Sequence, residues 1–355
     1  IIAKKPKVKL IPLSDPRDEN SNQLSNRLKR LQRREQFIFQ ETGARDLYVG
    51  WPFVEGKFND GTPLRAPLCF FPVELAQDNN NWVLCPKKEV NISFNKSLLL
   101  AFAHYNQIEL LDELVEFTFD GYDKESTPFK NMLYDQLRES PVGIRFSREF
   151  YAEQLHSFPT QHKSAFENAQ DDGEINIQMQ AVLGIFPQAD SYLVPDYDFL
   201  IDHLKDQSLD DFFTQKSLDL PDRTAPDFDH TRHFLNQTNE SETYTPFALD
   251  AYQENALNAV KKGNSIVIQG PPGTGKSQLI CNLAADFIAR GKKVLIVRQK
   301  RAAVDVVYER LKSIDAHNFA ALVHDFKGDR KAIYDQIANQ IDNTQTYRRS
   351  NNNLD

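Results

Sequence analysis

The chain has 355 residues, 40% of them hydrophobic and 26% charged, which is typical of a globular protein with room for two domains. No apolar run approaches the ~20 residues that a membrane-spanning helix needs, and a formal net charge of −8 argues against a surface covered with basic residues. The three scattered cysteines, Cys69, Cys85 and Cys281, are too few for a zinc site or a disulfide framework. We therefore expect a cytoplasmic protein with reduced thiols and no membrane partner.

Residues 1–43 form a basic segment, whose first 40 residues hold ten Lys or Arg against four Asp or Glu. Within it Leu24, Leu28, Leu31 and Phe39 recur at near-helical spacing, which predicts an amphipathic helix with a basic face. Two interpretations of that face stay open. It is either a nucleic-acid contact or a solvated helix surface, and the second is the commoner use of such charges.

Residues 44–215 are expected to form a mixed α+β accessory domain. Short apolar and aromatic runs separated by Gly, Pro and Asn predict strands at 46–56, 63–75 and 81–86. Two helical patterns and a further buried strand follow, at 95–117, 126–140 and 178–187.

Residues 216–245 are acidic, polar and interrupted by Pro221 and Pro226, so we expect a surface linker. His230 and His233 lie near aspartates in this segment. Loop composition explains them better than a metal site does.

The composition changes again at residue 246. A helix at 249–263 precedes an apolar strand at 264–270, and a second helix and strand follow at 276–291 and 292–298. Strands that are apolar throughout are typical of a parallel sheet buried on both faces. The fold class is therefore α/β, and residues 246–355 are expected to form the first part of a RecA-like P-loop domain with a parallel sheet.

A phosphate-binding motif lies between the first of these strands and the second helix. Residues 270–277, GPPGTGKS, match G-x-x-x-x-G-K-[ST] at every fixed position. Glycines let successive backbone N–H groups converge on phosphate oxygens, and the following helix directs its positive end to the same place. Lys276 is the candidate catalytic residue, reaching the β- and γ-phosphates, and the Ser277 hydroxyl is the candidate Mg²⁺ ligand. The sequence thus predicts a nucleoside triphosphate site.

The motif and its flanks resemble the Upf1-like branch of the superfamily 1 helicases. The resemblance is closer to large, mostly bacterial members with an N-terminal DUF4011 domain, on segments 65–75, 182–200, 245–257 and 322–341. It implies that ATP is the nucleotide and that Gln253 recognises adenine. The full set of predicted ATP-binding residues is Gln253, Gly270, Pro271, Pro272, Gly273, Thr274, Gly275, Lys276, Ser277 and Gln278.

The same resemblance implies that residues 294–311 contact single-stranded DNA or RNA, with Lys300 and Arg301 as the candidate residues. Better-known members have Pro-Ser/Thr-Asn where this chain has Arg298, Gln299, Lys300 and Arg301, so the family's backbone geometry does not carry over. Cations at this place suit phosphate contact, although a basic strand end facing solvent is the alternative.

Hydrolysis needs a carboxylate that holds Mg²⁺ and orients water, and Asp325 is the candidate after the loop. No second acid follows it, and no arginine finger is visible. We expect the parent protein to continue beyond these residues, with the hydrolytic carboxylates and a second lobe.

The expected function is that of the ATP-binding N-terminal part of a superfamily 1 DNA or RNA helicase or translocase, an ATP-hydrolysing enzyme that moves 5′ to 3′ on a single strand. The resemblance implies DNA processing or anti-phage defence, with the accessory domain contacting a protein partner. One alternative is a switch or scaffold ATPase without strand separation. Another is a binding module with a passive ATP site.

Overall fold

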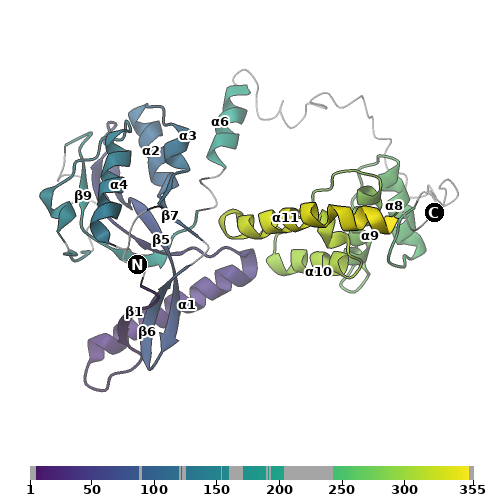
Figure 1. The fold of residues 1–355 in the computed structure, drawn as a ribbon, viewed down its shortest axis with the longest axis horizontal. Helices are drawn as coiled ribbons and strands as arrows, with labels where there is room; N and C mark the ends of the chain where they lie inside the picture. Colours follow the sequence, from purple (N-terminus) through teal and green to yellow (C-terminus); the bar gives the residue numbers. More distant parts are fainter. Residues whose placement is uncertain are drawn as a thin grey trace. The chain divides into compact units, whose positions relative to one another are not determined.

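The structure is a computed structural model that describes residues 5–87, 90–119, 121, 125–152, 154–159, 171–188, 191, 193–203 and 243–351. It divides into two compact units (Figure 1). The N-terminal unit holds residues 1–39 and 45–203, and the C-terminal unit holds 40–44 and 204–355. Nearly all of the predicted linker, with His230 and His233, lies outside the described residues.

Two sheets form the framework of the N-terminal unit. The larger has the order β1-β6-β5-β2-β10, with β7 paired to β5 and β8 to β7, and the smaller has the order β4-β3-β9. Every ladder between these strands is antiparallel. The strands are β1 (Val8–Pro12), β2 (Leu47–Gly50), β3 (Phe53–Lys57), β4 (Pro63–Pro67), β5 (Cys69–Asp78), β6 (Asn81–Pro86), β7 (Ile92–Phe94), β8 (Thr118–Phe119), β9 (Ile175–Gln178) and β10 (Val182–Ile185).

Helices pack an aromatic core against these sheets. They are α2 (Lys96–Asn106), α3 (Asp112–Val115), α4 (Ser126–Arg138) and the 3-10 turn η1 (Arg148–Tyr151). A further helix of this unit, α6 (Val194–His203), is mostly exposed. Asn95 caps α2 by accepting a hydrogen bond from the Leu98 amide. The Trp51 ring stacks on Phe150 at 6.2 Å between centroids, and Phe129 of α4 is fully buried beside it. Aromatic residues of this size dominate the burial energy of a core.

A second core forms where α1 (Glu19–Thr42) packs on the sheet in the N-terminal unit. Leu28 and Leu31 contact a buried cluster that includes Trp82 and Leu75. The predicted amphipathic helix is therefore present, with Leu28 and Leu31 inward, although Leu24 is 46% exposed.

The C-terminal unit is helical in its described part, with α8 (Ala251–Lys261), α9 (Lys276–Ala289), α10 (Arg301–Lys312), the turn η5 (Ala316–Phe319) and α11 (Phe326–Asn351). Its core is small and joins α9 to α10 through Cys281, Ala284, Val307 and Leu311. Tyr252 of α8 is 90% exposed, whereas Leu257 of the same helix is fully buried.

The mixed α/β class is confirmed, but the parallel sheet predicted for residues 246–355 is not formed in the described part of the chain. Residues 264–270 and 292–298 belong to no ladder. Val267 and Leu295 are 88% and 87% exposed, and of the second run only Ile296 packs on the core. A parallel sheet needs neighbouring strands and cover on both faces, and these two runs have neither here.

Among the described residues, no helix combines the length and apolar character needed to cross a bilayer.

Candidate nucleotide-binding site

The phosphate-binding motif forms a loop that leads directly into α9. Gly273 and Gly275 have φ angles of 88° and 76°, a region that residues with a side chain rarely adopt. Gly275 is the N-cap of α9, and no side chain caps the helix there. The Gln278 amide donates to the Gly275 carbonyl oxygen at 2.9 Å. Because the first amides of a helix have no acceptor in the preceding turn, the N–H groups of Lys276 and Ser277 remain available to an anion.

Lys276 folds back over its own loop. Its Nζ atom contacts the carbonyl oxygen of Gly270 and lies 2.7 Å from that of Pro271. The Thr274 hydroxyl donates to the same Pro271 oxygen at 2.8 Å. Lys276, Thr274 and both prolines are solvent-exposed. The ammonium group is thus held at the mouth of the loop, where a phosphate can replace the carbonyl oxygens as its partner.

Two glutamines connect the loop to the preceding segment. Gln253 of α8 donates from Nε2 to the Thr274 carbonyl oxygen at 2.9 Å, and its own amide donates to the capping Asp250 side chain at 2.8 Å. Gln278 of α9 donates to the Ala248 carbonyl oxygen. The structure thus brings Gln253 and Gln278 to the loop, while adenine recognition by Gln253 stays a prediction.

Buried polar side chains fix α9 behind the loop. Asn282 accepts from the Phe247 amide at 3.0 Å and donates to the Phe247 carbonyl oxygen at 2.9 Å. Asp286 accepts from the Tyr244 amide at 3.0 Å and lies 3.6 Å from Lys261 Nζ. Neither Asn282 nor Asp286 has solvent exposure. These bonds hold the segment before α8 against α9 and so set the register between Gln253 and the loop.

Arg298 is a site residue that our predicted set omits. Its Nη2 atom lies 3.5 Å from Ser277 Oγ, and its Nε atom is buried without a hydrogen-bond partner. A buried guanidinium N–H without a partner is costly, so an incoming phosphate oxygen would stabilise it. In the sequence, the only sign of this role is that Arg298 is a cation at the end of the apolar run 292–298. The spacing of residues does not predict its contact with Ser277.

The two predicted nucleic-acid residues lie at the start of α10. Lys300 is the N-cap residue and is exposed, and Arg301 begins the helix with its Nε atom 3.4 Å from Asp305 Oδ2. Asp305 also meets His324, with Nε2 and Oδ1 2.7 Å apart. Arg301 is therefore partly engaged within the unit. Lys300 also forms an ion pair, with its Nζ atom 2.9 Å from Glu41 Oε2, but its side chain is 62% exposed against 28% for Arg301.

The residues fit a nucleotide better than they complete a metal site. The loop, the α9 N-terminus and Lys276 provide the amides and the charge that phosphates need. Ser277 offers a hydroxyl to Mg²⁺, but no group of three His, Cys, Asp or Glu among the described residues could hold a metal ion. Asp325 lies just before α11, where its amide donates to Asp329 Oδ2 at 2.9 Å.

Comparison with known families agrees with this geometry. Residues 15–101 match the family described as "Protein of unknown function (DUF4011)", and residues 248–346 match the family described as "AAA domain". The chain carries a DUF4011 region and an AAA domain. The predicted resemblance to Upf1-like superfamily 1 helicases with an N-terminal DUF4011 domain is confirmed. The AAA domain contains the loop, α9 and α10, and the DUF4011 region contains α1.

Two curated relatives are uncharacterized ATP-dependent helicases of Mycoplasma. The chain is 28% identical over 305 residues to one from Mycoplasma pneumoniae and 28% identical over 315 residues to one from Mycoplasma genitalium. Each alignment covers 84% of this chain and 25% of the relative, so the chain spans about a quarter of their length. No solved structure matches the chain.

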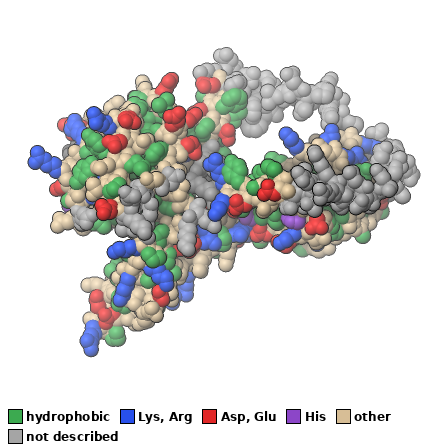
Figure 2. All heavy atoms as spheres, viewed as in Figure 1, with side chains coloured by type: hydrophobic (Ala, Val, Ile, Leu, Met, Phe, Trp, Pro, Cys, Tyr) green, Lys and Arg blue, Asp and Glu red, His purple; other side chains and the backbone are tan. Residues whose placement is uncertain are grey.

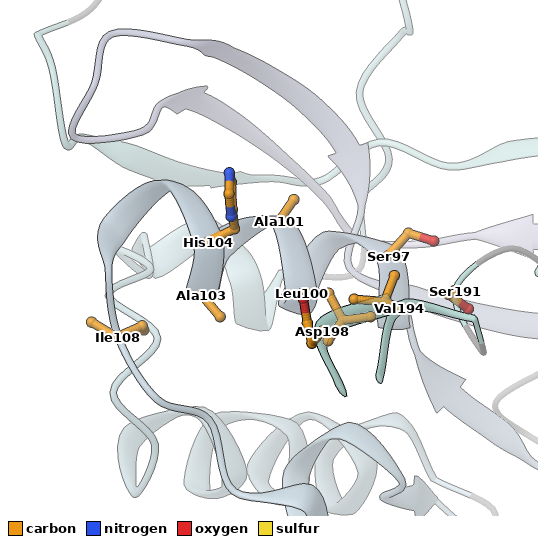
Figure 3. A pocket seen from close by; sticks show the side chains of 9 residues that line it. All are labelled: Ser97, Leu100, Ala101, Ala103, His104, Ile108, Ser191, Val194 and Asp198. Carbon is orange, nitrogen blue, oxygen red and sulfur yellow. The ribbon is translucent and has the colours of Figure 1, made fainter. Parts of the chain in front are cut away.

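A cavity of about 520 Å³ in the N-terminal unit is a poor alternative site for a nucleotide. It lies between α2 and α6, with His104 on one helix and Asp198 on the other (Figure 3). None of the described residues that line it is Lys or Arg. Without a cation to meet phosphate charge, this cavity does not compete with the loop.

Proposed function

We propose that this chain is the ATP-binding part of a superfamily 1 helicase or translocase, which couples ATP hydrolysis in the complete protein to movement on single-stranded nucleic acid. The observation that carries the proposal is the GPPGTGKS loop at the N-terminus of α9, with Lys276 Nζ held by loop carbonyl oxygens. The names of the two Mycoplasma relatives support it.

Each site residue has a role in this proposal. The amides of residues 273–277 hold the phosphates, and Lys276 moves from the loop carbonyl oxygens to the β- and γ-phosphates. The Ser277 hydroxyl holds Mg²⁺, which neutralises phosphate charge when bound. Gln253 exchanges its bond to Thr274 for the edge of adenine, since a side-chain amide both donates and accepts. Arg298 turns its buried Nε toward a phosphate oxygen.

The nucleic-acid contact is proposed at the start of α10, where Lys300 and Arg301 meet phosphates beside the positive end of the helix. Proximity to Arg298, which touches Ser277, offers a direct route by which nucleotide state changes strand affinity. DNA processing or anti-phage defence, 5′-to-3′ movement and a protein partner of the N-terminal unit extend the proposal by family analogy.

The second candidate is a switch or scaffold ATPase without strand separation. The two candidates differ in whether nucleic acid matters to the nucleotide site.

Two measurements on the 355-residue chain test the proposal: phosphate release with and without single-stranded DNA or RNA, and affinity for the same strands with and without ATP. The parallel variants are Lys276→Ala and, as a matched control, the exposed Lys262→Ala at the end of α8. We expect nucleotide-dependent strand binding that Lys276→Ala removes and Lys262→Ala keeps, with little turnover. Strand affinity that is the same with and without nucleotide would support the switch instead. Strong turnover would mean that a carboxylate within these residues serves hydrolysis, and Asp325 is the first candidate.

A further inference from the structure

The outer face of α1 concentrates positive charge on an otherwise acidic protein. Arg27, Lys29, Arg30, Arg33 and Arg34 are all exposed, and none forms an ion pair within the described part of the chain. Lys and Arg side chains recur over the arm that α1 forms with β1 and β6 (Figure 2). The net charge of the whole chain is −8, so this local excess is not a by-product of composition.

The five cations share one side of the helix. At about 100° per residue they fall within an arc of about 160°, and residues 27 to 34 cover about 10 Å of helix length. Glu35, the one acidic residue between 20 and 40, falls outside this arc. We call the arc the α1 basic face.

Three hydrogen bonds fix which side of α1 faces outward. Ser25 Oγ donates to the Leu13 carbonyl oxygen at 2.7 Å and accepts from Trp82 Nε1 at 2.8 Å. Gln32 Nε2 donates to the Leu75 carbonyl oxygen at 2.9 Å. With Leu28 and Leu31 packed beside them, these contacts hold the helix at one rotation. The basic face is thus presented by a rigid support, which binding sites require.

An exposed aromatic ring lies within the same arc. Phe37 is 63% exposed and follows Arg33 and Arg34 by one helical turn. Gln23 and Asn26 add amide groups to the arc, while the Asn22 amide is bonded to the Asp15 backbone. Two acidic residues, Glu19 and Glu41, fall within the same arc at the two ends of the helix. Cations with an aromatic ring beside them are the combination that binds single strands, because phosphates meet the charges and a base stacks on the ring. Phe37 is the one large apolar residue of the arc, so the face lacks the apolar area that membrane binding needs.

We propose that the α1 basic face is a second binding site for single-stranded nucleic acid, formed by Arg27, Lys29, Arg30, Arg33 and Arg34 with Phe37 as a base-stacking platform. The family model that covers this helix is described as a protein of unknown function. The inference extends the proposed function, on which it rests for the kind of polyanion bound. It gives the DUF4011 region the task of binding the strand at a site of its own.

The test is the affinity of the full chain for a fluorescent thymidine oligonucleotide of about 20 nucleotides, measured by anisotropy between about 50 and 200 mM salt. Arg30→Gln with Arg33→Gln is compared with Arg138→Gln with Arg148→Gln, a pair of exposed arginines elsewhere in the N-terminal unit. We expect the first pair to weaken binding about tenfold and to lower the salt slope by about 1.4, because each arginine that no longer meets a phosphate lowers the slope by ~0.7. Unchanged Trp fluorescence confirms that α1 stays packed on Trp82.

Phe37→Ala tests the stacking contact, with Phe199→Ala as its control because Phe199 is 60% exposed on α6. We expect Phe37→Ala to weaken single-strand binding about tenfold and to leave duplex binding unchanged. The inference is overturned if the α1 variants and their controls have equal effects. It is also overturned if Arg30→Gln with Arg33→Gln and Phe37→Ala both bind with wild-type affinity, a result that would point to an acidic protein as the partner of this face.

A further variant, Lys300→Gln with Arg301→Gln, separates this inference from the proposed function. Loss of binding only in that variant contradicts the α1 site and leaves the proposed strand contact standing. Loss only in the α1 variants supports the α1 site and contradicts the strand contact at α10.

Discussion

Removal of the Asp286 carboxylate should unfold the C-terminal unit at a much lower denaturant concentration. Asp286 has no solvent exposure, and its partner Lys261 has a side chain only 7% exposed, with Nζ and Oδ1 3.6 Å apart. Asp286→Ala leaves the Lys261 charge buried without its counter-ion and removes the acceptor of the Tyr244 amide. Breaking a buried pair in this way costs about 3–5 kcal/mol of unfolding free energy.

Two further variants separate the causes of that loss. Asp286→Asn keeps an acceptor for the Tyr244 amide but removes the charge, so we expect an intermediate loss. Arg290→Ala removes the other cation, whose Nε lies 3.1 Å from Asp286 Oδ2 and whose side chain is 31% exposed. Because solvent screens that pair, we expect a cost of about 1 kcal/mol or less.

Urea unfolding measures these differences in each unit separately. Both tryptophans, Trp51 and Trp82, lie in the N-terminal unit, so their fluorescence reports on that unit. Helical circular dichroism reports on both units. With a urea slope of about 1–3 kcal/mol per molar, a loss of about 3–5 kcal/mol should move the C-terminal transition of Asp286→Ala down by about 1–5 M and leave the Trp transition in place. An Asp286→Ala shift no larger than that of Arg290→Ala, or an equal shift of the Trp signal, would refute the reasoning.

Four other outcomes follow from the structure. Gln253→Ala should weaken ATP binding about tenfold and leave GTP binding unchanged, and equal losses would show that Gln253 only braces the loop through Thr274. Calorimetry should show that Arg298→Ala weakens ATP binding more than Arg298→Lys does, because Lys keeps a positive charge beside Ser277. The guanidinium of Arg298 contacts Ser277, and its Nε atom is buried without a hydrogen-bond partner. Cys85 should react with a thiol reagent in the folded protein, whereas the buried Cys69 and Cys281 should react only on unfolding, which a count of modified thiols at neutral pH checks. Burial raises the pKa of the Cys69 and Cys281 thiols, so both should stay protonated and unreactive when the pH is raised moderately. Modification of either thiol before the protein unfolds would contradict the packing.

Much of the N-terminal unit is predictable because its signals are local. The alternation of apolar residues with Gly, Pro and Asn located β2, β3, β5 and β6, and the leucine spacing located α1. The GPPGTGKS motif placed the loop before α9 correctly, since motif and helix are adjacent in sequence. The domain boundaries at 43, 215 and 245 stay predictions.

The failures all concern partners that are distant in sequence. Residues 264–270 and 292–298 have strand-like composition, but a strand exists only with a neighbour to bond to, and composition does not supply one. Asn282 and Asp286 look like surface residues of a helix by type. They are buried because backbone groups at Tyr244 and Phe247 satisfy them, and that pairing spans about 40 residues. Arg298 was missed as a site residue for the same reason, because its contact with Ser277 depends on how α9 and the following segment lie together.

Calorimetric titration of the 355-residue chain with ATP in the presence of Mg²⁺ tests the central claim most directly, with Lys276→Ala beside wild type and Lys262→Ala as control. The account predicts one ATP per chain and unchanged binding in Lys262→Ala. Binding should weaken about ten- to a hundredfold in Lys276→Ala, because that variant removes a charged hydrogen bond worth about 1.5–3 kcal/mol. Binding of equal strength in wild type and Lys276→Ala, or no binding to the wild-type chain, would contradict the assignment of the loop as the nucleotide site.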